Sequence, residues 1–168
     1  MADAFDPIAV LQALDKQRVT YIVIGALGRV ISGSDELTDG IDIVPSTREE
    51  NLRRLGLALD DLNAQRPNGR RPSLKRDLAR SPVLELQTDH GELKIVPEPA
   101  GTRGYDDLRR AATREPLGHG LRPSVASIGD HARMLAALDR EQDRTPLRTL
   151  RRLIELEQER SRRLVIER

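Results

Sequence analysis

A short apolar run at residues 19–24, Val-Thr-Tyr-Ile-Val-Ile, constrains the fold more than any other feature, and it ends at Gly25. The run is rich in β-branched residues and too short for a buried helix, and the glycine after it favours a tight turn. This pattern predicts a buried strand that leads into a turn. A second apolar run, residues 41–44, stops at Pro45 and predicts a second strand. Both strands need other elements to cover them.

Helical patterns alternate with these strands. Between residues 48 and 63 leucines recur at three- and four-residue spacing, and Glu49 and Glu50 fall in the first turn, where the helix dipole favours acidic residues. Ser127 and Asp130 have the spacing of a capping box. Helices are expected at residues 6–17, 26–31, 48–63, 105–112, from 127 and from 145, the last with a buried stripe of Leu147, Leu150, Leu153, Ile154 and Leu156.

The remaining segments predict a hairpin, an edge strand and a loop. Residues 83–88 and 92–97 alternate around Asp89-His90-Gly91, residues 121–125 form a short edge strand, and residues 65–73 form a mobile surface loop. This order predicts an α/β (α+β) fold, a small mixed β-sheet flanked by helices with C-terminal helices. The 168 residues are expected to form one domain, with an α/β core at 1–126 and a helical segment at 127–168 packed on it.

Composition excludes several classes of function. The 28 basic and 27 acidic residues nearly cancel, so a charged partner must be recognised by a local patch. Cysteine is absent, the three histidines lack metal-ligand spacing, and no serine lies in a Gly-x-Ser-x-Gly motif. With only three aromatic residues, stacking of single-stranded bases is disfavoured. No leader pattern and no apolar run of membrane length is seen, so we expect a cytoplasmic protein without a membrane partner.

One stretch resembles a known family. A strand ending in Gly25-Ala26 is followed by Gly33-Ser34 and then by an acidic strand, Thr38-Asp39-Gly40-Ile41-Asp42-Ile43. This pattern resembles the opening of the nucleotidyltransferase fold, and it is most similar to the minimal and abortive-infection toxin branch (AbiEii type). Residues 101–108 are similar to the glycine loop and helix of the family, and Arg140 and Asp143 to its Arg-x-x-Asp element.

The resemblance implies a metal site that this chain has lost in part. Two magnesium ions in such enzymes neutralise the triphosphate, and they need carboxylates from two neighbouring strands. Here the first carboxylate position holds Gly40, the second keeps Asp42, and the third holds Lys94. Gly25, Ala26, Gly33, Ser34 and Lys94 are the residues that the resemblance assigns to nucleotide binding. We expect no bound metal, and an ion pair between Lys94 and Asp42 in its place.

The resulting hypothesis is a nucleotidyltransferase-like protein that binds rather than transfers, with a regulatory role of bacterial toxin–antitoxin or defence type. Its partners would be a nucleotide, a protein or a second copy of the chain; RNA is weakly supported, because the arginines after residue 144 alternate with glutamates. The alternative is a magnesium-dependent nucleotidyltransferase that modifies tRNA, a protein or a small molecule. Its catalytic residues would be Asp42 with Asp39 or Glu92.

Overall fold

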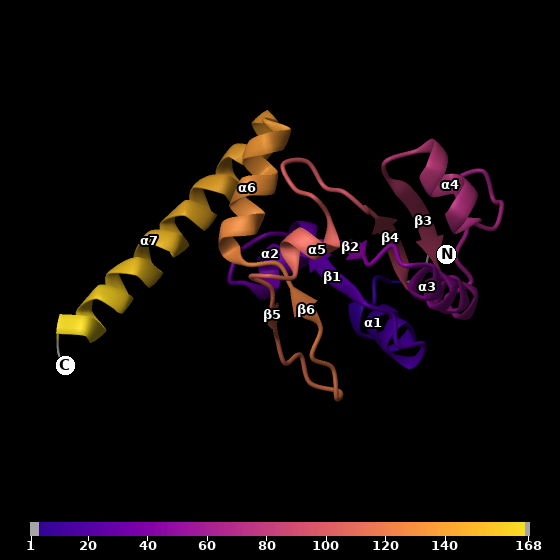
Figure 1. Cartoon of the computed structure of the whole chain (residues 1–168), viewed down its shortest axis with the longest axis horizontal. Helices are drawn as coiled ribbons and strands as arrows, with labels where there is room; N and C mark the ends of the chain where they lie inside the picture. Colours follow the sequence, from indigo (N-terminus) through magenta and orange to yellow (C-terminus); the bar gives the residue numbers. More distant parts are fainter. Residues whose placement is uncertain (1–3, 167–168) are drawn as a thin grey trace.

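Six strands form one mixed sheet in the computed structural model, which describes residues 4–166 (Figure 1). They are β1 (Tyr21–Ile24), β2 (Gly40–Pro45), β3 (Leu84–Thr88), β4 (Gly91–Ile95), β5 (Thr113–Arg114) and β6 (Ser124–Val125). The spatial order is β3-β4-β2-β1-β6-β5. The β2–β4 and β1–β6 pairs are parallel and the other pairs are antiparallel. The prediction of a small mixed sheet is therefore confirmed.

Seven α-helices surround the sheet within residues 4–166. They are α1 (Pro7–Lys16), α2 (Gly25–Ile31), α3 (Glu49–Asp61), α4 (Leu74–Arg80), α5 (Tyr105–Leu108), α6 (Ile128–Leu138) and α7 (Arg144–Ile166), with a 3₁₀ turn, η1 (Glu141–Asp143), before the last. Asp6 caps α1 by accepting a hydrogen bond from the Ala9 N–H, and Ser127 caps α6 by accepting one from the Asp130 N–H. Both predicted helix starts are confirmed.

The two faces of the sheet are covered unequally. One face packs against α1 and α3 through a large cluster of fully buried side chains, including Leu11, Leu14, Leu55, Ile41 and Ile43. The other face carries a smaller cluster built around Ile22, Ile24, Val44, Leu108 and Met134. Because side chains alternate along a strand, Asp42 lies between Ile41 and Ile43 in sequence but on the opposite, thinly covered face.

Asn51 joins the helical layer to the sheet. Its side-chain amide donates to the carbonyl oxygens of Thr20 and Ser46, and its side-chain oxygen accepts from the Thr20 N–H at 2.7 Å. The residue is buried at the start of α3. These bonds fix the entrance of β1 and the exit of β2, and satisfy backbone groups that burial would otherwise leave unpaired.

Several sequence predictions are corrected. Helix α4 and strand β5 were not predicted, and α5 ends at Leu108 instead of continuing to residue 112. The strand expected at the sheet edge, β6, lies between β1 and β5, so β5 is the edge. Of the predicted stripe on the last helix, Leu150 is fully buried whereas Leu156 is 44% exposed. The physical reason is that α7 extends beyond the helix it packs on.

Helix α7 projects from the body of the protein (Figure 1). Its first half packs on α6, while Leu164, Val165 and Ile166 near its end are exposed. Among residues 4–166, no helix combines the length and the apolarity needed to cross a lipid bilayer. Helix α6 also packs on α2, so residues 127–166 contact the core; the division of the chain at residue 126 stays a prediction.

Candidate functional site

A cleft of about 800 Å³ opens on the thinly covered face of the sheet. One wall is formed by β1, β2, β3 and β4 with α2, and the other by α6 and η1. The polar lining consists of Arg29, Asp42, Glu85, Lys94, Glu98, His131, Arg140, Gln142 and Asp143. Its apolar part includes Ile24, Val96, Met134, Leu135 and Leu138. The volume and this mixture are typical of a small-molecule site.

Charged residues form a row across three strands on the sheet wall. Asp42 of β2 is in register with Lys94 of β4, and Lys94 is in register with Glu85 of β3. The strand register that the sequence comparison assumed, with Asp42 beside Lys94, is therefore confirmed. Glu85 was not singled out from the sequence, although its place opposite Lys94 follows from the hairpin once its turn is fixed.

Asp42 is held close to the start of α2. A Cβ atom on Gly25 would lie 2.5 Å from the Oδ2 atom of Asp42, and Gly25 has φ +69°, so only glycine fits there without strain. Burial raises the pKa of the Asp42 carboxyl group; Lys94 opposes this, Glu92 adds to it, and Arg29 and Arg140 oppose it from farther away. The Asp42 carboxylate is thus partly desolvated, and the nearby cations offset only part of this cost.

The prediction that Lys94 forms an ion pair with Asp42 is wrong, because Lys94 pairs with Glu92. The Nζ atom of Lys94 lies 3.6 Å from Oε1 of Glu92, and within residues 4–166 it has no other carboxylate oxygen within 4.0 Å. Glu92 and Lys94 are two residues apart on β4 and so share a face. Both side chains are about one-third exposed, at 32% and 37%. This pairing costs less desolvation than one with the more deeply placed Asp42.

The backbone at position 40 leaves no room for a side chain. Gly40 is in register with Glu92, and a Cβ atom on Gly40 would lie 2.9 Å from the Glu92 carbonyl oxygen. Asp39 is exposed in the loop before β2, and neither Asp39 nor Glu92 lines the cleft. Within the described part of the chain, no three His, Asp or Glu side chains come together as metal ligands. One carboxylate beside an ammonium group does not fit a two-magnesium site.

The residues assigned to nucleotide binding separate into two groups. Gly25, Ala26 and Lys94 line the cleft. Gly33 and Ser34 do not: Ser34 is buried and donates from Oγ to Oε2 of Glu36 at 2.7 Å. Arg29 also binds Glu36, through two hydrogen bonds of 2.8 and 2.9 Å. This cluster fastens the loop after α2, and the role of Gly33 and Ser34 in ligand binding stays a prediction that the cleft lining does not support.

On the helical wall, Arg140 and Asp143 form the ion pair suggested by the Arg-x-x-Asp spacing. Arg140 donates from Nε to Oδ2 of Asp143 at 2.6 Å and from Nη2 to Oδ1 at 3.1 Å. Asp143 is buried and Arg140 is about half exposed. Two parallel bonds to one carboxylate fix the guanidinium plane. The pair places a rigid, internally neutral group at the rim of the cleft.

His131 of α6 is the functional candidate that the sequence reasoning missed. Its residue exposure is 1%, and neither ring nitrogen has a hydrogen-bond partner within residues 4–166. The ring packs on α2, because a Cβ atom on Gly28 would lie 2.8 Å from its Cε1 atom. Burial lowers the pKa of His131 to about 4, and Arg29 lowers it further while Glu36 raises it. The ring is therefore neutral at pH 7.

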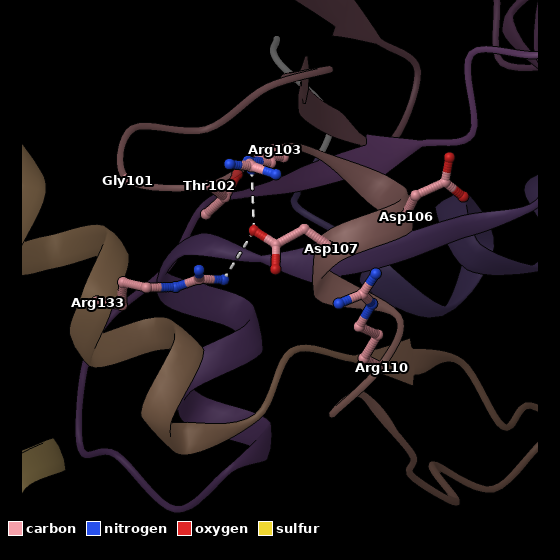
Figure 2. Close-up of a pocket in the computed structure, with 7 residues that line it drawn as sticks. All are labelled: Gly101, Thr102, Arg103, Asp106, Asp107, Arg110 and Arg133. Atoms are coloured by element: carbon pink, nitrogen blue, oxygen red, sulfur yellow. Dashed lines mark hydrogen bonds and ion pairs between the residues drawn. The ribbon is translucent and has the colours of Figure 1, made fainter.

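A second hollow, of about 570 Å³, shares no lining residue with the cleft (Figure 2). Figure 2 shows Asp107 of α5 at its centre, accepting hydrogen bonds from the Arg103 backbone N–H at 2.9 Å and from Nη2 of Arg133 at 3.1 Å. The backbone bond from Arg103, followed by the charges of Arg133 and Arg110, lowers the pKa of the Asp107 carboxyl group. These contacts fasten the loop at residues 101–104 to α6, so their role is structural.

No known family model and no curated protein matches this chain, whereas solved structures do. The lincosamide antibiotic adenylyltransferase LnuA, solved with lincomycin bound, is 16% identical, with a TM-score of 0.60 over 89% of this chain and 98% of that one. A putative nucleotidyltransferase from Thermotoga maritima, TM1012, is 19% identical, with a TM-score of 0.49 over 95% of this chain and 89% of that one. At such identities the likeness to LnuA shows the fold alone: the chain has a nucleotidyltransferase-like fold.

Proposed function

We propose that the protein binds a ligand in the cleft without metal-dependent nucleotidyl transfer, and acts as a binding or regulatory protein of toxin–antitoxin or defence type in the cytoplasm. The observation that carries this proposal is the position of Lys94, directly beside Asp42 on the neighbouring strand. An ammonium group at this position repels the divalent cations that nucleotidyl transfer requires.

Electrostatics supports the proposal. Three carboxylates at the family's positions would carry three negative charges, whereas Gly40, Asp42 and Lys94 together carry none. The nearby Glu92 is paired with Lys94 at 3.6 Å, so it adds little free negative charge. Hard divalent cations are held by several oxygen ligands at once. A single carboxylate facing an ammonium group has little affinity for magnesium.

The ligand we propose is a nucleotide or another small molecule that binds without metal. The cleft offers an apolar floor from α6, a cationic group at Lys94 and a neutral ring at His131. LnuA, which has a similar fold, is an adenylyltransferase solved with lincomycin bound. A protein partner or a second copy of the chain remains part of the proposal, since the end of α7 exposes Leu164, Val165 and Ile166.

The alternative is an active enzyme that uses magnesium with Asp42 and either Asp39 or Glu92. One observation favours it: Glu92 is close enough to raise the pKa of Asp42, so the two carboxylates interact. It requires a rearrangement in which Lys94 leaves Glu92 and the carboxylates converge on one ion.

Incubation with labelled nucleoside triphosphates, magnesium or manganese, and RNA, protein or small-molecule acceptors tests the two functions against each other. The proposal predicts no labelling that depends on Asp42. Asp42→Asn is compared with Asp60→Asn, whose side chain is exposed on α3 and makes no hydrogen bond or ion pair within residues 4–166. Labelling by wild type and Asp60→Asn but not by Asp42→Asn would establish the alternative.

Titration calorimetry with nucleotides tests ligand binding directly. We expect equal affinity with and without magnesium, and a loss of about tenfold in Lys94→Met, since one ion-dipole or ion-ion contact in a cleft contributes roughly 1.4 kcal/mol. Lys16→Met, an exposed lysine at the end of α1, is the matched control. Affinity that appears only with magnesium would contradict the proposal.

A further inference from the structure

The basic residues are not spread evenly over the surface. Six of the chain's 28 basic residues, but only one of its 27 acidic residues, fall within residues 66–80. Without this segment the chain would be net acidic. The segment comprises the loop before α4 and α4 itself.

Five of these cations face solvent without a partner. Arg70, Arg71, Lys75, Arg76 and Arg80 are all exposed, and none of their side chains makes a hydrogen bond or an ion pair with any residue in the range 4–166. We call these five residues the α4 basic surface. The sixth, Arg66, binds the buried Asp77 with its Nη1 atom 3.1 Å from Oδ1.

Several exposed arginines on other helices have an acidic partner, and the exposed arginines of α7 that lack one share their helix with Glu155, Glu157 and Glu159. Glu50 pairs with Arg53 and Arg54 on α3, Asp130 with Arg133 on α6, and Glu155 with Arg152 on α7. Helix α4 has no exposed acidic residue, and Arg76 and Arg80 stand four residues apart, where like charges destabilise a helix by about 0.2–0.5 kcal/mol. An uncompensated cluster of this kind indicates a ligand with the opposite charge.

The surface is held in a fixed shape. Asp77 accepts a hydrogen bond from the Ser73 N–H at 2.8 Å as well as from Arg66, and so closes the start of α4. Leu74 is buried, and the Arg66 and Arg70 backbones bond to each other at 2.8 Å. The loop that the sequence predicted to be mobile is therefore tied at several points. A backbone that is already fixed loses less conformational entropy when its side chains bind a ligand.

We propose that the α4 basic surface binds the phosphate backbone of a double-helical nucleic acid. The segment contains no aromatic residue that would stack on unpaired bases. It also exposes no large apolar side chain, which the centre of a protein interface or a membrane anchor would need. Regularly spaced phosphates need only cations, and arginine binds them in a bidentate manner.

The surface adjoins the cleft. Pro82 and Val83 follow Arg80 closely in sequence and line the cleft, as does Glu85. A smaller hollow of about 410 Å³, lined by Arg66 and Arg80 among others, shares Val83 and Glu85 with it. A duplex on the α4 basic surface would therefore lie at the rim of the cleft. The inference goes beyond the proposed function and does not depend on what the cleft binds.

Fluorescence anisotropy with short labelled duplexes tests the proposal. Duplex RNA, duplex DNA and single-stranded RNA are each titrated with the full chain at salt concentrations from about 50 to about 200 mM, the range over which phosphate contacts weaken strongly. We expect binding to at least one duplex, and the duplex with the higher affinity identifies the partner as RNA or DNA. Single strands are expected to bind more weakly, because stacking side chains are missing.

The salt dependence of the binding constant gives the number of phosphate contacts. Each cation that binds a phosphate adds about −0.9 to the slope of log K against log salt, so Arg70/Arg71/Arg76→Ala should reduce the slope by nearly 3. The matched control is Arg160/Arg162/Arg163→Ala, which removes the same charge from exposed positions at the end of α7. It should leave the slope unchanged. A triple Arg→Lys variant of the first set should keep most of the slope, because each point charge remains.

Several results would overturn the proposal. They are the absence of duplex binding at low salt, equal loss in the two alanine triples, or preference for single strands over both duplexes. Asp42→Asn serves as the second reference, because it alters the cleft and not the α4 basic surface. If Asp42→Asn kept the wild-type salt slope for duplex binding but lost ligand binding in the cleft, the duplex proposal would stand independently of the proposed function.

Discussion

The two walls of the cleft differ in how their carboxylates are neutralised. On the helical wall, Asp143 is buried and receives two hydrogen bonds from Arg140, so its charge is satisfied within the protein. On the sheet wall, Asp42 is partly buried, yet within residues 4–166 no cation lies within ion-pair distance of it. The charge on the helical wall therefore serves the structure, whereas the charge of Asp42 is not neutralised by an ion pair within the described residues.

The largest expected effect concerns His131 on the helical wall, which is buried and whose ring nitrogens have no hydrogen-bond partner within residues 4–166. The unfolded chain binds a proton at this residue near pH 6.5 and the folded chain near pH 4, because burial lowers the pKa. The unfolded state therefore holds more protons between these values, so stability should fall by about 3 kcal/mol as the pH falls through this window. Urea denaturation at a series of pH values measures it.

The control for this effect is a second histidine. His131→Leu should remove most of the fall, whereas His119→Gln, at an exposed position, should leave it in place. A pH profile of His131→Leu that coincides with that of wild type would show that another group titrates.

The next effect concerns the contact between Gly25 and Asp42. Gly25→Ala should destabilise the fold by roughly 2–3 kcal/mol, since a positive φ costs about 1–2 kcal/mol and crowding against a carboxylate adds to it. Gly69→Ala also has a positive φ but meets nothing within 4 Å, so it isolates the backbone cost. Equal losses of unfolding free energy in the two variants would show that Asp42 moves away without cost.

Removal of the helical-wall cation should have a smaller effect. Arg140→Ala leaves the buried Asp143 unpaired, and because Arg140 is half exposed we expect a loss of about 1–2 kcal/mol. Lys94→Met on the sheet wall should cost less than about 0.5 kcal/mol, because its ion pair with Glu92 is partly exposed. Thermal denaturation of both variants tests the difference between the walls, and a reversed order would contradict it.

The smallest effect has the opposite sign. Because burial raises the pKa of Asp42, the ionised form is unfavourable in the folded state, and Asp42→Asn should slightly stabilise the protein at pH 7. The gain should disappear below the pKa of an unfolded aspartate, where Asp42 is protonated in both states. Denaturation at pH 7 and pH 3 checks it, with Asp60→Asn as the neutral reference.

Much of the frame could be predicted from the sequence because it depends on local signals. β-branched runs marked β1 and β2, and Asp6-Pro7 and Ser127 marked two helix starts. Helix α4 was missed because its seven residues are mostly charged, and its only apolar signal is Leu74 and Leu78 at four-residue spacing. Strand β5 has two residues, too few for any alternation to be seen.

The strand register of the candidate site was predicted from the sequence, but its side-chain contacts were not. The sequence predicted that residues 42 and 94 are neighbours, because the resemblance places them on adjacent strands. It did not identify Glu92 as the partner of Lys94, because that choice depends on the exposure of each side chain. His131 was dismissed as isolated, although it lies on the apolar face of α6 with Met134, Leu135 and Leu138, a spacing that indicates burial.

Side chains alternate between the two faces of the sheet along β2, so the same strand supplies both the core and the cleft. Ile41 and Ile43 fill the main core while Asp42 faces the cleft. The insertion or deletion of one residue early in this strand would turn the carboxylate inward and both isoleucines outward. Substitutions in the cleft, and not insertions or deletions early in β2, can therefore change its chemistry while the protein still folds.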